Sequence, residues 1–261
     1  MIIEQDVYNT PINVLINTMI REYDISKANI NILLYYGKIS SKEYNRLLIA
    51  PKIEREKEIG LIQRYNKDIS ETLKKGFVEF RKQLFISNNL KESDILAIRK
   101  DAVFVIDKEL KDTVFGNVEF KMKNVYSSFY RIKMYQTLEM YFSSTDLEVK
   151  GIGDESLKLH KNFMIDYLQY IFYEAETRPI YTVLVELKNF MDVYRNKELS
   201  IEYYREFNNF SRYKTLYKVL DQTVYLDSIS GKDIDTVDIS YNYEFLNKLY
   251  QIYLNMYFRT R

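Results

Sequence analysis

Hydrophobic positions in the first third of the chain recur mostly with helical spacing. The clearest case is residues 68–90, where apolar residues stand three or four positions apart and predict a long amphipathic helix. Residues 19–25 instead predict a strand that leads to Asp24. Shorter helices are expected at residues 10–18, 26–37 and 40–50.

The pattern changes to strands after residue 93. Residues 94–107 predict a hairpin with a polar turn at 99–101, and further strands are expected up to residue 152. Helical spacing returns at Asp154 and continues to the last helix. This order predicts an α+β fold, in which an antiparallel sheet with helices packed on it is followed by an all-helical C-terminal lobe.

The composition excludes several classes of site. Of the 261 residues, 46% are hydrophobic, which is enough for a sizeable core, and the net charge of +1 gives no global signal for a polyanionic partner. The chain has no cysteine, and His160 is its single histidine. Disulfides, zinc–thiolate sites and histidine metal clusters are therefore excluded.

We expect a cytoplasmic protein, located in the host cytoplasm if a virus encodes it. The N-terminal residues are partly acidic and lack the basic segment of a signal peptide. No apolar run approaches the ~20 residues that a membrane span needs, so no membrane partner is expected. The 25 tyrosines, with abundant Ile, Asn and Lys, are typical of AT-rich genomes, many viral genomes among them.

Two aspartates stand at positions where strands end or turn. Asp24 ends the predicted strand 19–25, and Asp101 lies in the turn of the predicted hairpin. If these strands are neighbours, both carboxylates emerge at one edge of the sheet, where a divalent cation would stabilise the pair. Each residue also has a simpler interpretation: Asp24 as a helix cap before Ser26, and Asp101 as an ordinary turn residue.

Four stretches resemble the palm motifs of the B-family DNA polymerases and follow the order of that family. "EYDISKANINIL" looks like the first palm motif, and "LAIRKDAVFVI" looks like the third. "RIKMYQTLEMY" is similar to the Lys-x-Tyr element that touches the primer strand, and "LEVKGI" to the Val-Lys-Gly stretch before the thumb. The resemblance covers roughly residues 19–152 and implies a divergent, minimal palm.

The resemblance implies roles for individual residues. Asp24 and Asp101 would be the catalytic residues that bind two Mg²⁺ (or Mn²⁺) ions, and the backbone that follows Asp24 would meet the triphosphate. Lys133 and Tyr135 would hold the primer, with Lys150 near it. The resemblance also implies a palm-like α+β domain at 1–152, with short fingers at about 38–67, and a helical thumb-like domain at 153–261.

The chain departs from the family pattern in two motifs. The fingers motif, a Lys followed by Asn-Ser-x-Tyr-Gly, is replaced by "REKEIGLIQRYN", which offers Arg55, Lys57 and Arg64 as triphosphate partners. These basic residues alternate with glutamates, so a solvated helix face explains them equally well. In the third motif only the second of the two usual aspartates is kept, as Asp101.

The leading hypothesis is therefore a DNA polymerase-like nucleotidyltransferase that acts on nucleic acid and nucleoside triphosphates by a two-metal mechanism. The first alternative is a catalytically inactive palm-like subunit, which binds nucleic acid or the other proteins of a viral replication or transcription complex. The second alternative is a structural protein of the virion.

Overall fold

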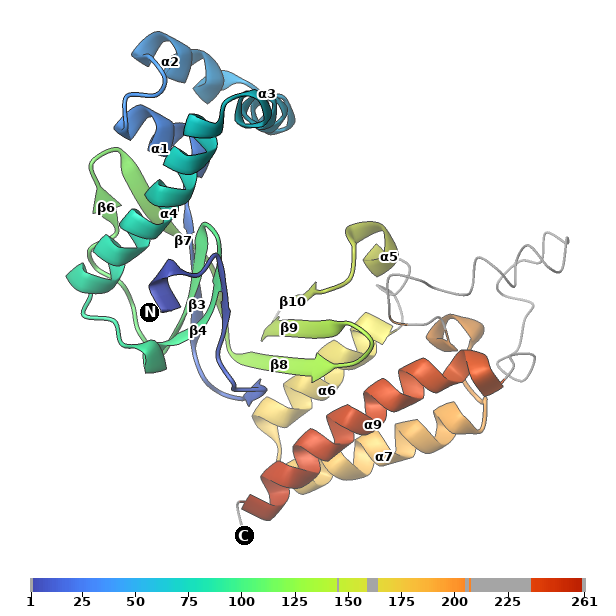
Figure 1. Cartoon of the computed structure of the whole chain (residues 1–261). Helices are drawn as coiled ribbons and strands as arrows, with labels where there is room; N and C mark the ends of the chain where they lie inside the picture. Colours follow the sequence, from blue (N-terminus) through green and yellow to red (C-terminus); the bar gives the residue numbers. More distant parts are fainter. Residues whose placement is uncertain (1, 145, 159–163, 205–206, 208–235, 260–261) are drawn as a thin grey trace, which may run out of the picture. The chain divides into compact units, whose positions relative to one another are not determined.

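The computed structural model describes residues 2–144, 146–158, 164–204, 207 and 236–259 (Figure 1). His160 lies outside the described residues. The chain divides into two compact units. Unit 1 consists of Met1–Pro11 and Met19–Val125, and unit 2 consists of Ile12–Thr18 and Tyr126–Arg261.

A six-stranded sheet forms the framework of unit 1. In spatial order its strands are β1 (Val7–Asn9), β4 (Ile95–Arg99), β5 (Ala102–Ile106), β3 (Ile20–Ile25), β7 (Val118–Tyr126) and β6 (Val114–Phe115). The pairs β1–β4, β4–β5, β3–β5 and β6–β7 are antiparallel. Strands β4 and β5 form the predicted hairpin, and β3 lies beside it.

Four helices of unit 1 lie in the sequence between β3 and β4, and short 3-10 helices η1 (Ile2–Glu4) and η2 (Glu92–Asp94) complete the unit. The four are α1 (Ala28–Tyr35), α2 (Ser41–Ile49), α3 (Lys52–Tyr65) and α4 (Lys67–Ser87). Side-chain caps fix two of their starts: Ser40 Oγ accepts from the Glu43 amide at 3.2 Å, and Asn66 Oδ1 accepts from the Asp68 amide at 3.1 Å.

Helix α4 packs on one face of the sheet, and polar groups can therefore lie on the other face. Phe77 and Phe80 of α4 share one buried cluster with Tyr23 of β3 and Val103 of β5. Because successive side chains of a strand point to opposite faces, Asp24 lies on the face of β3 opposite Tyr23.

Unit 2 contains a second antiparallel sheet. Its strands are β10 (Asp146–Lys150), β9 (Thr137–Ser143), β8 (Ser128–Lys133) and β2 (Val14–Leu15). The helical elements of this unit are α5 (Asp154–Lys158), α6 (Asp166–Thr177), α7 (Ile180–Arg195), η4 (Ile201–Tyr204) and α9 (Thr236–Arg259). Tyr130 of β8 stacks on Phe172 of α6 with ring centroids 3.9 Å apart, and the Tyr253 hydroxyl of α9 bonds to the Tyr130 hydroxyl at 3.2 Å.

The structure confirms the α+β class and the predicted elements at 19–25, 94–107 and 68–90. The helix predicted at 10–18 is wrong, because this segment contains strand β2. Its backbone is engaged by strands instead: the Thr10 amide donates to the Leu96 carbonyl at 3.0 Å, and the Arg131 amide donates to the Asn13 carbonyl at 2.7 Å.

The compact units also divide the chain at a different place from the expected limits of 1–152 and 153–261. Strands β8 to β10 belong to unit 2. The reason is packing, since Tyr130, Leu138 and Met140 of these strands are buried in one cluster with Leu187 of α7 and Tyr253 of α9. After Asp154 the regular elements in the described residues are helices, as expected.

Candidate functional site

The structure brings Asp24 and Asp101 together within unit 1. Strands β3 and β5 are adjacent, and Asp24 lies opposite Ala102, the residue that follows Asp101. The amide of Ile25 donates to the carbonyl oxygen of Asp101 at 3.1 Å. The condition set by the sequence, that the two strands be neighbours, is therefore met, and the two aspartates lie at the same end of the β3–β5 pair.

The surroundings of Asp24 disfavour its negative charge. Burial, followed by the negative charges of Asp101 and Glu22, raises the pKa of the Asp24 carboxyl to about 6, against the opposing effect of Lys123. One oxygen of this carboxyl, Oδ1, is buried without a hydrogen-bond partner among the described residues. A cation bound at this point would satisfy that oxygen and neutralise the repulsion between the carboxylates.

The interpretation of Asp24 as a helix cap is wrong. Helix α1 begins at Ala28, its N-cap residue is Lys27, and no side chain caps it. Lys27 has a φ of 46°, a left-handed conformation that separates β3 from the helix. The Ser26 amide donates to the Glu119 carbonyl at 2.9 Å, so the chain is still bound to the sheet two residues after Asp24.

Asp101 does lie in the β4–β5 turn, as its simpler interpretation requires. The described residues contain no group of three or more His, Cys, Asp or Glu side chains placed to hold a metal ion. The protein itself thus offers two carboxylates. That number suits Mg²⁺, which is commonly held by one or two carboxylates together with water and substrate phosphates.

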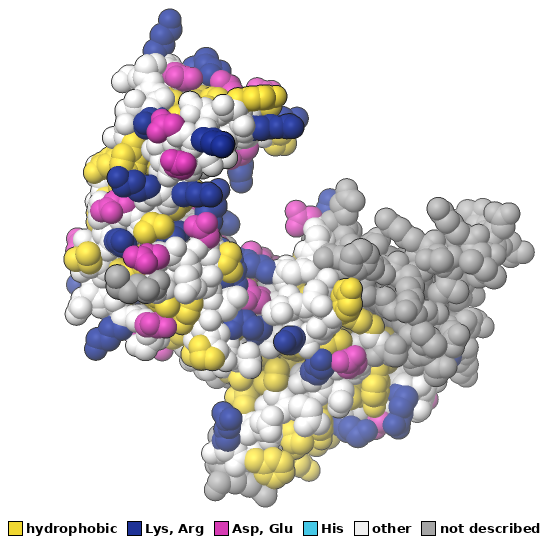
Figure 2. Space-filling model, viewed as in Figure 1, with side chains coloured by type: hydrophobic (Ala, Val, Ile, Leu, Met, Phe, Trp, Pro, Cys, Tyr) yellow, Lys and Arg dark blue, Asp and Glu magenta, His cyan; other side chains and the backbone are white. Residues whose placement is uncertain are grey.

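The three predicted triphosphate partners lie on helix α3 of unit 1. The Arg55 side chain is turned inward: the residue is 8% exposed, and its guanidinium donates to the Ala50 carbonyl at 3.4 Å. Lys57 and Arg64 are exposed, and two helical turns separate them, which places them on one face. Figure 2 shows basic and acidic side chains intermixed over α2 and α3.

The predicted primer-binding residues all lie in unit 2, at one end of its sheet. Lys133 ends β8, where it pairs with Thr137, and Lys150 ends β10. Tyr135 lies in the turn between β8 and β9 and is 91% exposed. Lys150 is less available, because its Nζ lies 3.4 Å from a Glu148 carboxylate oxygen and 5.0 Å from the centroid of the Tyr141 ring.

Comparison with protein-family models gives a match to the family described as Bacteriophage PBS1 gene 130 protein, over residues 2–255. The chain belongs to this family. A search of curated proteins found no match. The expectation of a viral protein is thereby confirmed, whereas the comparisons identify no polymerase family.

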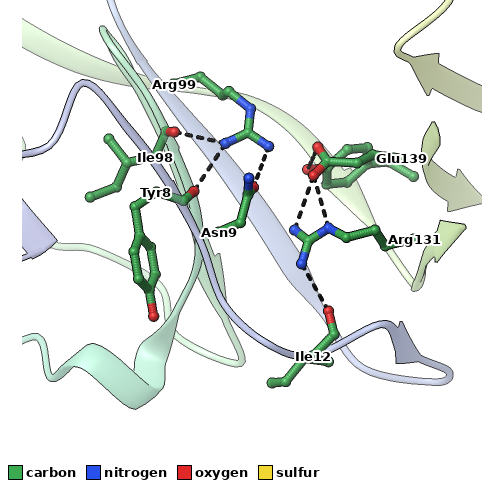
Figure 3. Close-up of polar contacts among 8 residues, drawn as sticks. Tyr8, Asn9, Ile12, Ile98, Arg99, Arg131 and Glu139 are labelled. Carbon is green, nitrogen blue, oxygen red and sulfur yellow. Dashed lines mark hydrogen bonds and ion pairs between the residues drawn. The ribbon is translucent and has the colours of Figure 1, made fainter. Parts of the chain in front are cut away.

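In this member of the PBS1 gene 130 protein family, an arginine stands where the resembling polymerase motif has its first aspartate. Arg99 Nη1 donates to the carbonyls of Tyr8 at 3.0 Å and Ile98 at 2.8 Å, and Nη2 donates to Asn9 Oδ1 at 2.6 Å (Figure 3). The bonds to Tyr8 and Asn9 attach β1 to β4. Arg99 therefore stabilises the packing of unit 1 and adds no carboxylate to the site.

Asp24 has polar neighbours on the same sheet that were not among the predicted site residues. Glu22 is buried and accepts a hydrogen bond from Asn124 Nδ2 at 2.7 Å, while Lys123 Nζ lies 3.8 Å from its carboxylate. Glu22 stands two residues before Asp24, and period-two alternation alone places both on one face of β3. That signal was present in the sequence, whereas the approach of Lys123 and Asn124 from β7 was not.

No helix among the described residues of this family member combines the length and apolar character needed to cross a membrane.

Proposed function

We propose that the chain is a DNA polymerase-like nucleotidyltransferase in which Asp24 and Asp101 hold divalent cations. One observation carries the proposal: the two aspartates that the resemblance assigns to the metals lie side by side on β3 and at the β4–β5 turn. The unpartnered buried oxygen of Asp24 and its raised pKa support a cation at this position.

The residues would divide the work as follows. Asp24 and Asp101 would fix Mg²⁺ or Mn²⁺, which when bound lowers the pKa of an attacking hydroxyl and stabilises the charge on the phosphate. Lys57 and Arg64 would neutralise the triphosphate, since both side chains are exposed. Arg55 would contribute less, because its guanidinium is already engaged.

The primer contacts are assigned to the other unit. Lys133 and Tyr135 would bind a nucleic-acid strand through a charge on phosphate and an exposed ring that can stack on a base. Lys150 would first have to release Glu148. The palm-like and thumb-like identities of the sheet and the C-terminal helices remain part of this proposal.

A second candidate is a palm-like subunit without catalysis, which binds nucleic acid or partner proteins in a phage replication or transcription complex, or in the virion. The observation that favours it is Arg99, which occupies the place of a motif aspartate and donates hydrogen bonds to Tyr8 and Asn9 of β1. The absence of the fingers motif from the sequence also favours a subunit without catalysis.

Manganese binding separates the two candidates. Calorimetry on the wild type, Asp24→Asn and Asp101→Asn should show binding that either substitution weakens at least about a hundredfold, with loss of primer extension. Lys188→Ala, a substitution on α7 of unit 2, is the matched control and should bind manganese as the wild type does. Manganese binding or primer extension that survives either aspartate substitution would remove the catalytic assignment.

A further inference from the structure

Arg81, on helix α4 of unit 1, is fully buried with 0% exposure. Its guanidinium donates hydrogen bonds to three backbone carbonyls. Nε donates to the carbonyl of Ile3 at 3.1 Å, Nη2 to that of Gln5 at 3.1 Å, and Nη1 to that of Lys100. The Asp6 carboxylate lies 3.8 Å from Arg81 Nη2, and that side chain is largely exposed. Burying a cation in this way is costly unless hydrogen bonds compensate for the lost hydration.

The third of these carbonyls belongs to the residue that precedes Asp101. Lys100 has a φ of 47°, in the left-handed region that a lysine rarely adopts without support. Its amide donates to the Asp6 carbonyl at 2.6 Å, and its Nζ lies 4.9 Å from the centre of the Phe77 ring. Lys100 is therefore fixed at its amide, its carbonyl and its side chain.

Two of these three attachments come from one face of α4. Phe77 and Arg81 are four residues apart, so they lie one above the other on the helix. Phe77 receives the Lys100 side chain, and Arg81 binds the Lys100 carbonyl. The peptide group that joins Lys100 to Asp101 is thus held by α4, and with it the direction in which the Asp101 side chain leaves the turn.

The positive charge of Arg81 also interacts with Asp101. Burial lowers the pKa of the guanidinium, while the negative charges of Asp6 and Asp101 act in the opposite direction. Arg81 is therefore close enough to Asp101 for their charges to interact. The planar fork of the guanidinium matters here as well as its charge, because a lysine at this position could not reach three carbonyls in different directions.

We propose that Arg81 is a positioning residue for the metal site: it holds the Lys100 carbonyl and so keeps Asp101 beside Asp24. This inference rests on the proposed function, since it concerns the same pair of carboxylates. Residues that orient metal ligands in this way commonly change metal affinity by about 10- to 100-fold when they are replaced.

The test uses the full chain with Arg81→Lys, which keeps the charge and removes the planar fork. We expect manganese affinity by calorimetry to fall at least about tenfold. The matched control is Arg131→Lys in unit 2, which replaces another nearly buried arginine that bonds to a backbone carbonyl, that of Ile12, at 3.1 Å. The control should lose thermal stability and keep its manganese affinity within about twofold.

A second measurement needs no metal. The Ile25 amide donates to the Asp101 carbonyl, so its hydrogen exchange reports whether the turn stays beside β3. In Arg81→Lys this amide should exchange about tenfold faster, while the Val103 amide, in the core of the sheet, keeps its rate. Equal acceleration of both amides would show a general loss of stability and would overturn the positioning role.

The outcomes separate the two proposals. If the wild type binds manganese and Arg81→Lys binds it equally well, the positioning role is wrong and the proposed function stands. If the wild type binds no manganese with primer–template and nucleotide present, the proposed function fails, and the exchange of the Ile25 amide alone decides whether Arg81 sets the turn. If Arg81→Lys does not fold, Arg81→Met takes its place, because it keeps an unbranched side chain of similar length without a buried charge or its hydrogen bonds. Unchanged manganese affinity and Ile25 exchange in Arg81→Met would overturn the proposal.

Discussion

Charged side chains on the two sheets of the protein have opposite kinds of neighbours. On β8 and β9 of unit 2, Arg131 and Glu139 are paired residues, and Arg131 Nε donates to Glu139 Oε1 at 3.0 Å (Figure 3). The other oxygen of Glu139 accepts from the Tyr141 hydroxyl at 3.2 Å. On β3 of unit 1, Asp24 has two acidic neighbours, Asp101 and Glu22, and a buried oxygen without a partner among the described residues.

This difference separates a structural pair from a candidate site. The Arg131–Glu139 pair is complete, because each charge meets an opposite charge and further hydrogen bonds. The Asp24–Asp101 pair is incomplete in a specific sense, since it has an excess of negative charge and an unused acceptor. An external cation is the simplest group that completes it.

Breaking the complete pair should have the largest effect on stability. In Glu139→Gln the nearly buried guanidinium of Arg131 loses its countercharge, and we expect a loss of about 3 kcal/mol in the free energy of unfolding. Urea denaturation of the full chain measures this loss. The control Lys188→Ala removes an exposed i,i+4 pair with Asp192 and should leave the midpoint unchanged. If both variants have the same stability, the Arg131–Glu139 pair does not stabilise unit 2 as proposed.

The incomplete pair should show itself in the dependence of stability on pH. The Asp24 carboxyl has an ordinary pKa of 3.8, which rises to about 6 in the folded protein. Between these two values the folded state holds a proton that the unfolded state has released, so stability falls as the pH rises through this window. We expect Asp24 to contribute about 1 kcal/mol to this fall, after allowance for solvent screening.

Urea unfolding in the presence of a chelator, from pH 4 to pH 7, measures this fall. Asp24→Asn cannot titrate, so it should lack this part of the slope and become relatively more stable at neutral pH. An identical slope in wild type and Asp24→Asn would mean that Asp24 is an ordinary exposed carboxylate.

The smallest expected effects lie on helix α3. Lys57→Ala and Arg64→Ala should each raise the KM for nucleoside triphosphate about threefold without changing stability, because both side chains are exposed. Arg55→Ala should instead lower stability, since it removes an inward-turned guanidinium that bonds to the Ala50 carbonyl. Steady-state primer extension and urea denaturation distinguish the two classes. Unchanged KM in both exposed variants would favour a solvated helix face.

Local patterns predicted the elements that position the site. The strand at 19–25 and the helix at 68–90 carry their periodicity in their own residues, so they needed no tertiary information. The segment 10–18 misled the prediction because its polar and apolar residues also fit a helix, whereas its structure is set by pairing with β8 and by the bond to Leu96. Strand pairing over such a distance leaves no trace in local spacing.

The site was predictable only in part for the same reason. The adjacency of Asp24 and Asp101 followed from an ordered set of motifs, once β3 and β5 were assumed to be neighbours. Arg81 gave no signal of its own, because a charged residue in an amphipathic helix is normally expected on the solvated face. Its burial follows from where the N-terminal segment and the β4–β5 turn meet α4, which is a property of the folded unit.

The short strand β2 is synthesised long before the strand with which it pairs. Val14 belongs to unit 2 and pairs with Tyr130 of β8, although the segments on both sides of it belong to unit 1. On the ribosome, β2 emerges before almost all of unit 1, and its partner strand emerges only after unit 1 is finished. The units are consequently not successive modules that could be cut apart or exchanged, because the sheet of unit 2 includes a strand that is made before most of unit 1.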